Sequence, residues 1–206
     1  MSQTSEFKRA RGRPRDPQIE PRILDAAMTL YAAAGWSGFT FDVLARTTGV
    51  GKAALYSRWN NRMELLRATL ETRWFVVSTI DTGSLRADLL ELCHMVFSQL
   101  TGPYAAITIH LHADALRFED IGAITSSYGE VLVRQGRTLI TRAIDRGELP
   151  HETDPALLLD PLIGGVTNHV LSTPMRLRDT MLVRAPAFIS KLVDLLLSGI
   201  AADVRT

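Results

Sequence analysis

The chain has 206 residues, 46% of them hydrophobic and 22% charged, which suits a globular protein with one large or two small domains. Its net charge of +1 hides a split between the two ends. Residues 1–62 hold ten Lys and Arg against five Asp and Glu, whereas residues 63–206 hold thirteen against seventeen. A basic front and an acidic rear indicate a polyanion-binding head on a different kind of body.

Nothing in the sequence points to export or to a membrane. Cys93 is the single cysteine, so an intrachain disulfide is impossible and a reducing compartment fits. The first 17 residues lack the apolar core of a signal peptide. The longest uncharged stretch, 92–113, is interrupted by Gly102-Pro103 and contains polar side chains, which indicates two helices meeting at a turn. We expect a cytoplasmic protein with no membrane partner.

Residues 1–17 predict a flexible basic arm, because they contain few apolar residues and two prolines. A helix is expected from Ile19, where apolar residues recur at spacings of three and four, and Gly35 is expected to end it. A short helix over about 41–48 follows, with Thr40 as its N-cap and Gly49 closing it.

The next predicted helix, 52–59, buries Leu55 and Trp59 on one face. Asn61 and Glu64 resemble a capping box for a longer helix that reaches about residue 79. Further helices are expected at about 84–100, 103–118, 123–147, 154–171 and 180–200, and no period-two alternation is long enough to predict a strand. The fold class is therefore all-α, with the arm 1–17, a head 18–62 and a helical body 63–206.

The run Gly49-Val50-Gly51-Lys52 allows two interpretations, a phosphate-binding loop or the turn of a helix-turn-helix. A P-loop needs its first glycine at position 46 and a hydroxyl residue at position 53, where this chain has Arg46 and Ala53. A helix also replaces the strand that should precede the loop. A helix-turn-helix needs a tight turn between two short helices, and Gly49 supplies it. This interpretation leaves the outer face of the second helix available to DNA.

Residues 23–66 resemble the tetracycline-repressor (TetR) family of bacterial regulators through an ordered series of landmarks. These are AA…LY…G, FT, LA…GV, LY, an aromatic residue at 59 and a final ELL. The resemblance implies a three-helix DNA-binding head, a fourth helix leading to a ligand-binding body, and a homodimer. Residues 146–171 resemble a C-terminal body found in one branch of the family. The chain departs from the family at Gly51, Ala53 and Ala54, where relatives often carry hydroxyl residues.

The resemblance implies that Lys52, Tyr56 and the Thr40 amide contact phosphates and that Arg62 reaches the DNA backbone. Ser57 and Arg58 are expected at base edges, with Ala54 against a thymine methyl group. The alternative is a merely solvated surface. The arm is expected to place arginines in the minor groove, although it could equally be a solubilising tail. The candidate DNA-binding residues are Arg11, Arg13, Arg15, Thr40, Lys52, Ala53, Ala54, Tyr56, Ser57, Arg58 and Arg62.

The body is expected to form a ligand pocket and a dimer interface, although each chosen residue could instead belong to ordinary intrachain core. Two apolar stripes on the last helices suggest a four-helix bundle between two copies, namely Leu158, Leu162, Val166, Val170, Phe188, Leu192, Leu195 and Leu196. The candidate ligand-binding residues are Trp74, Phe97, Tyr104, Ile107, His110, Leu111, Tyr128 and Asn168.

No catalytic, metal or cofactor site is predicted. His110 and His112 are two apart and point to opposite sides of a helix, and no serine or cysteine lies in a catalytic motif. We expect a ligand-responsive transcriptional regulator, by resemblance a repressor, that binds a palindromic operator as a homodimer and is released by a small molecule. The alternatives are a DNA-binding dimer without a ligand and a helical enzyme.

Overall fold

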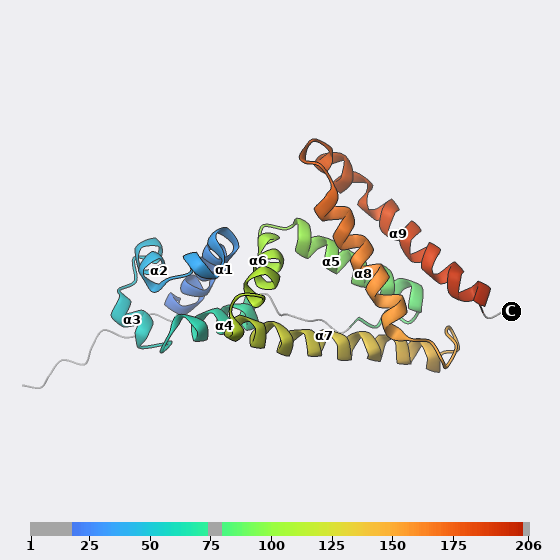
Figure 1. Ribbon diagram of the computed structural model, residues 1–206, viewed down its shortest axis with the longest axis horizontal. Helices are drawn as coiled ribbons and strands as arrows, with labels where there is room; N and C mark the ends of the chain where they lie inside the picture. The colour runs from blue at the N-terminus through green and yellow to red at the C-terminus, as the bar shows by residue number, and fades with distance from the viewer. Residues whose placement is uncertain (1–17, 74–79, 204–206) are drawn as a thin grey trace, which may run out of the picture.

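The computed structural model describes residues 18–73 and 80–203, and all its regular secondary structure in those ranges is helical (Figure 1). The predicted arm and the segment 74–79 lie outside the described residues, and so do Arg11, Arg13, Arg15 and Trp74. The all-α prediction is confirmed. The elements are α1 Ile19–Gly38, α2 Phe41–Thr48, α3 Lys52–Tyr56, α4 Arg62–Arg73, α5 Leu85–Thr101, α6 Ala106–Ala115, α7 Glu119–Asp145, α8 Pro155–Ser172, η1 Met175–Leu177 and α9 Arg178–Asp203.

Local signals set the ends of α2. The Thr40 hydroxyl accepts a hydrogen bond from the Val43 amide at 3.3 Å, as an N-cap does. Gly49 follows the last turn with φ 71°, in the left-handed region that glycine adopts without steric cost. The predicted bounds of α2 are therefore confirmed.

Among the N-terminal helices, two predicted helix ends differ from the structure. Gly35 takes φ 56° and kinks α1, but helical structure continues to Gly38. The third helix ends at Tyr56 instead of 59, since the Arg58 and Trp59 amides both bond to the Leu55 carbonyl and close a turn. At α4, the Glu64 amide donates to Asn61, whereas the Glu64 carboxylate accepts from Asn60, one residue earlier than in a capping box.

Two hydrophobic clusters build most of the core. The first contains residues of α1, α2, α3 and α4, together with Ile107 and Leu111 of α6 and Ile121 and Ile124 of α7. The second fills the space between α5, α7, α8 and α9. Figure 1 shows α3 at one extremity of the molecule and the long pair α8 and α9 at the other, with α6 between them. The core of the N-terminal helices thus continues into the body through α6.

Candidate nucleic-acid interface and cavity

The helix α3 is anchored from beneath and exposed on its outer face. Leu55 is fully buried and Trp59 is 7% exposed, so both hold α3 against α1 and α2. Tyr56 is 57% exposed, and its ring meets the edge of Phe41 at a centroid distance of 4.7 Å. This contact fixes the direction of the Tyr56 ring while its hydroxyl group stays in solvent.

Lys52, at the start of α3, is paired with Asp42 of α2. Their side chains are 56% and 64% exposed, and an ion pair this open contributes about 0–1 kcal/mol to stability. The ammonium group can therefore exchange Asp42 for a phosphate at little cost. The start of a helix also favours an anion through its dipole.

The polar side chains that directly follow α3 form hydrogen bonds to the backbone of the helix. The Ser57 hydroxyl and the Arg58 guanidinium both donate to the Ala54 carbonyl, at 3.0 and 2.9 Å. Ala53 is exposed, whereas Ala54 is half-buried against the core. Of the predicted base-contacting residues, Ser57 lies in solvent and Arg58 is half-buried.

Arg62 has partners inside the chain. Its Nη1 donates to the carbonyl groups of Trp36 and Phe39 at 3.1 and 3.2 Å, and its guanidinium lies 3.8 Å from the Trp36 ring centroid. The start of α4 is thereby fixed to the end of α1. Sequence spacing could not reveal this contact, because the partners lie 26 and 23 residues away.

A buried carboxylate joins the N-terminal helices to α6. Asp114 Oδ2 accepts hydrogen bonds from the Tyr31 hydroxyl at 3.0 Å and from the Trp36 amide at 2.8 Å. Burial and the neighbouring Asp114 carboxylate raise the pKa of Tyr31 above its ordinary value. The kink at Gly35 brings the backbone of α1 against His110 and Asp114. Asp114 is not among the residues predicted from the sequence.

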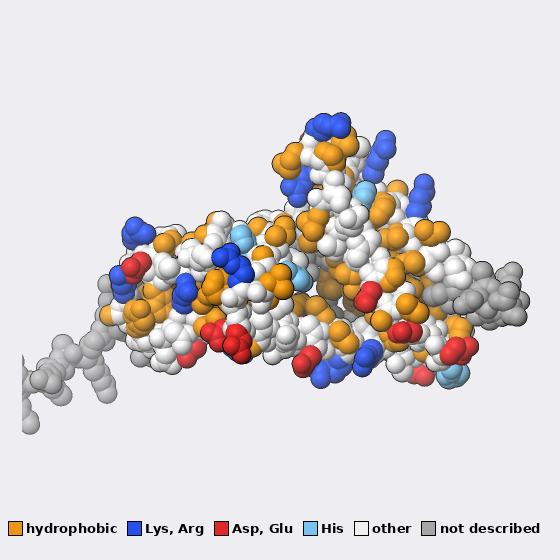
Figure 2. Space-filling model, viewed as in Figure 1, with side chains coloured by type: hydrophobic (Ala, Val, Ile, Leu, Met, Phe, Trp, Pro, Cys, Tyr) orange, Lys and Arg blue, Asp and Glu red, His pale blue; other side chains and the backbone are white. Residues whose placement is uncertain are grey.

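A cavity of about 1020 Å³ lies between α5, α6, α7 and α8, and Figure 2 shows this face of the molecule hollowed there. Most of its lining side chains are apolar, among them Leu92, Met95, Val96, Leu159 and Ile163. The uncharged polar side chains at the wall are Gln99, Thr108, His112, Thr125, Tyr128, Gln135, Thr138 and Thr167. This is the composition and size of a small-molecule site.

Two of the predicted ligand-binding residues, Leu111 and Tyr128, line this cavity. Ile107 is buried in the first core cluster and Tyr104 packs on it. His110 faces the Tyr31 ring, Phe97 packs in the body core, and Asn168 is exposed and accepts a hydrogen bond from Ser172. The periodicity of the sequence showed which faces are apolar but not which of them border a hollow.

Two known protein families match this chain, one over its N-terminal helices and one over its body. Residues 23–69 match the family described as bacterial regulatory proteins, tetR family, and residues 79–189, more than half of the chain, match the tetracyclin repressor-like C-terminal domain. The chain belongs to the TetR family. It is a DNA-binding transcriptional regulator and not an enzyme.

Individual TetR-family proteins agree with this assignment. The DNA-binding transcriptional repressor TetR of Mycobacteroides abscessus is 28% identical over 179 residues, which cover 84% of this chain and 88% of that protein. The fold resembles that of Salmonella enterica GusR, with a TM-score of 0.70, 14% identity, and 90% of this chain and 98% of that chain covered. It also resembles FadR of Bacillus subtilis, solved in complex with stearoyl-CoA, with a TM-score of 0.63, 17% identity, and coverage of 87% and 98%.

In this TetR-family chain, the predicted interface residues of α8 are buried within a single copy, whereas those of α9 are half-buried or exposed. Leu158, Leu162, Val166 and Val170 are at most 2% exposed in a single copy, so they have almost no surface left for a second copy. Phe188 stacks on His169 at 3.8 Å, and Leu192 and Leu196 are half-buried. Of the residues predicted for the interface, Leu195 alone is broadly exposed, at 67%. The other large apolar side chains that are exposed among the described positions of these two helices are Leu157, Leu171, Leu182 and Val183.

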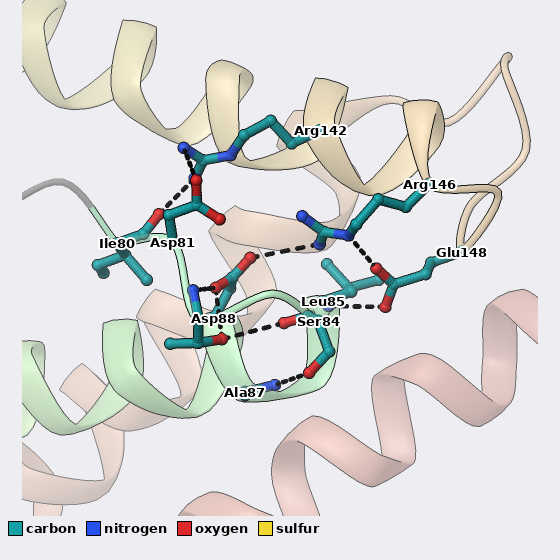
Figure 3. A network of polar contacts seen from close by, with 10 residues as sticks. Ile80, Asp81, Ser84, Leu85, Ala87, Asp88, Arg142, Arg146 and Glu148 are labelled. Carbon is teal, nitrogen blue, oxygen red and sulfur yellow. Dashed lines mark hydrogen bonds and ion pairs between the residues drawn. The ribbon is translucent and has the colours of Figure 1, made fainter.

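A polar network fixes the start of α5 to the end of α7 (Figure 3). The fully buried Asp88 accepts hydrogen bonds from the Thr82 amide and hydroxyl group at 2.6 and 2.7 Å and pairs with Arg146 at 3.4 Å. Burial favours a higher pKa for Asp88, but the Thr82 hydrogen bonds and the Arg146 charge outweigh it and lower the pKa. Glu148 accepts from the Leu85 amide at 2.7 Å.

The described residues form neither a metal-binding cluster nor a membrane-spanning helix. Within 18–73 and 80–203, no three His, Cys, Asp or Glu side chains come together as a metal ion would require. No helix in the same ranges has the length and hydrophobicity needed to span a bilayer.

Proposed function

We propose that the protein is a homodimeric repressor that binds a palindromic operator in the cytoplasm and is released by a small molecule bound in the body. The observation that carries the DNA-binding part is the position of α3, exposed on its outer face and anchored by Leu55 and Trp59. A short helix held in this way can enter a major groove. Two copies related by a two-fold axis would read two half-sites.

Within this proposal, Lys52 and Tyr56 contact phosphates, and Thr40 offers its backbone amide. Ala53, Ala54, Ser57 and Arg58 face the base edges, with Arg58 leaving the Ala54 carbonyl on binding. Arg62 instead acts as a positioning residue, because its guanidinium already holds the end of α1 against α4. The arm 1–17, with Arg11, Arg13 and Arg15, remains a predicted minor-groove contact.

The dimer part of the proposal rests on the exposed apolar residues of α8 and α9. Leu157, Leu171, Leu182, Val183 and Leu195 lie in solvent in a single copy, at exposures from 44% to 82%. A second copy would remove them from water. We expect Val183→Asp with Leu195→Asp to give a monomer in analytical ultracentrifugation. Leu116→Asp, at a 90% exposed position after α6, is the control that should leave the dimer intact.

The effector part rests on α6. This helix supplies Thr108, Leu111 and His112 to the cavity wall and carries Asp114, which holds α1. A ligand that displaces α6 would therefore displace the head. FadR of Bacillus subtilis was solved with stearoyl-CoA, which supports a ligand-binding body in this fold. The rival is a DNA-binding dimer that senses no ligand, favoured if a broad metabolite panel yields no thermal stabiliser.

The experiment that tests the function is selection of bound sequences from random duplex DNA by the purified protein. A palindromic consensus is expected, and Tyr56→Ala should weaken its binding without unfolding the head, because Tyr56 is exposed. A selected pool without any enriched motif would contradict the proposal. Enrichment of a single, unpaired half-site would contradict the palindromic operator but would still support DNA binding.

A further inference from the structure

The cavity continues into a groove along α7. This groove has a volume of about 620 Å³ and is lined by Glu130, Val133, Arg134, Arg137, Thr138, Thr141 and Arg142. All of these except Glu130 and Thr141 also line the cavity. The cavity therefore opens directly onto this groove, and one elongated molecule could occupy both.

Guanidinium groups dominate the shared part of the wall. Arg134 and Arg137 are exposed, one helical turn apart, and neither guanidinium group makes a hydrogen bond or ion pair with any described residue. Arg142 donates to the Ile80 carbonyl and pairs with Asp81 at 3.3 Å, but its Nε is buried without an acceptor. A buried donor without a partner is costly, and a ligand oxygen would relieve that cost.

The carboxylates that line the cavity and the groove do not neutralise Arg134 and Arg137. Asp154 caps α8 by accepting from the Ala156 amide at 2.9 Å. Asp160 and Glu130 are exposed, and neither forms an ion pair with a described residue. Free guanidinium groups bind carboxylates and phosphates through paired, charge-assisted hydrogen bonds.

We infer that the effector is an amphipathic organic anion, with its apolar portion in the cavity and its carboxylate or phosphate group against Arg134, Arg137 and Arg142. This inference rests on the proposed function only in taking the cavity as the effector site. Gln99 and Tyr128 also line the cavity and add uncharged polar groups to its wall.

The test uses three probes with one ten-carbon chain, namely decanoate, decanol and decyltrimethylammonium, titrated calorimetrically into the full-length protein. Decanoate should bind about tenfold more tightly than either other probe, as charge-assisted hydrogen bonds imply. The double variant Arg134→Gln with Arg137→Gln should remove this preference. Arg184→Gln, an exposed arginine of α9 away from the cavity, is the matched control and should keep it. Equal binding of the probes, tightest binding of the cation, or binding of none would overturn the inference.

A second pair of variants tests where the chain lies. Gly129 lines the cavity, and a Cβ atom there would meet no atom within 4 Å, so we expect the side chain of Gly129→Phe to occupy part of the hollow. It should weaken decanoate binding about tenfold, whereas Gly129→Ala should not. Unchanged binding by Gly129→Phe would place the chain elsewhere and overturn the inference.

Release from the selected operator separates this inference from the proposed function. Arginine-dependent decanoate binding that leaves the operator bound supports the ligand class and contradicts the effector role. Operator release by a neutral or cationic compound whose binding Gly129→Phe abolishes contradicts the ligand class and supports the effector role.

Discussion

The carboxylate of Asp114 on α6 accepts a hydrogen bond from the hydroxyl group of Tyr31 on α1, and both side chains are buried. The same oxygen accepts from the Trp36 amide, so one carboxylate holds two points near the end of α1. Because Leu111, one turn earlier on α6, lines the cavity, this contact links the cavity wall to the DNA-binding helices. We therefore expect a displacement of α6 at the cavity wall to reach α1 through these hydrogen bonds.

Tyr31→Phe should lower the free energy of unfolding by about 1–3 kcal/mol, because hydrogen bonds to charged groups contribute this much and a buried carboxylate oxygen loses one donor. Urea unfolding followed by circular dichroism measures it. Tyr104→Phe is the control, since the Tyr104 hydroxyl has no partner among the described residues and its loss should change little. Equal destabilisation by both variants would show that the contact with Asp114 contributes nothing specific.

The same contact gives an alkaline signature. Burial and Asp114 raise the pKa of Tyr31 above its ordinary 10.0, so the folded protein keeps this proton after the unfolded chain has lost it. This contribution to stability is complete below pH 10 and is lost as the pH rises further. The wild type should therefore lose stability more steeply than Tyr31→Phe as the pH rises above about 10. Parallel curves for the two proteins would contradict the assignment.

Gly35→Ala should destabilise the fold by at least about 1–2 kcal/mol, because φ 56° suits glycine and strains alanine. Its Cβ atom would also lie 2.8 Å from His110 Nδ1 and 3.2 Å from Asp114 Oδ2. Gly129→Ala, inside α7, is the matched control, since a Cβ atom there meets nothing within 4 Å and its φ is not in the left-handed region. Thermal unfolding compares the two variants. A Gly35→Ala protein as stable as the control would show that the contact between α1 and α6 accommodates the added methyl group without strain.

The predictions from sequence held where the cause is local. The cap by Thr40, the turn at Gly49 and the inward direction of Leu55 depend on residues within a few positions of one another. Asp114 could not be found in this way, since its partner Tyr31 is 83 residues distant. The stripe on α8 shows the other limit. An apolar face predicts burial, but it cannot tell whether the same chain or a second copy covers it, and the structure packs Leu162 inside the chain.

Thr82→Val should lower the free energy of unfolding at pH 7 by about 1–3 kcal/mol, because buried Asp88 loses a hydroxyl donor at 2.7 Å. The native pKa of Asp88 is lowered below its ordinary 3.8. The stabilisation is therefore present above that value and is lost as the pH falls through the native pKa. The gap between variant and wild type should close in acid. Thr29→Val, an exposed helical threonine, is the control and should shift stability little at either pH.

Lys52→Gln should weaken operator binding and flatten its salt dependence. If the ammonium group exchanges Asp42 for a phosphate, its loss removes one released counterion, and the slope of log K against log salt should fall by about 0.9. Stability should change little, because the Lys52–Asp42 pair is exposed. Lys191→Gln is the matched control, since it removes the same charge from an exposed position on α9, far from α3 in Figure 1. Fluorescence anisotropy at several salt concentrations gives both slopes. The same slope for the two variants would mean that Lys52 acts only through the net charge of the protein.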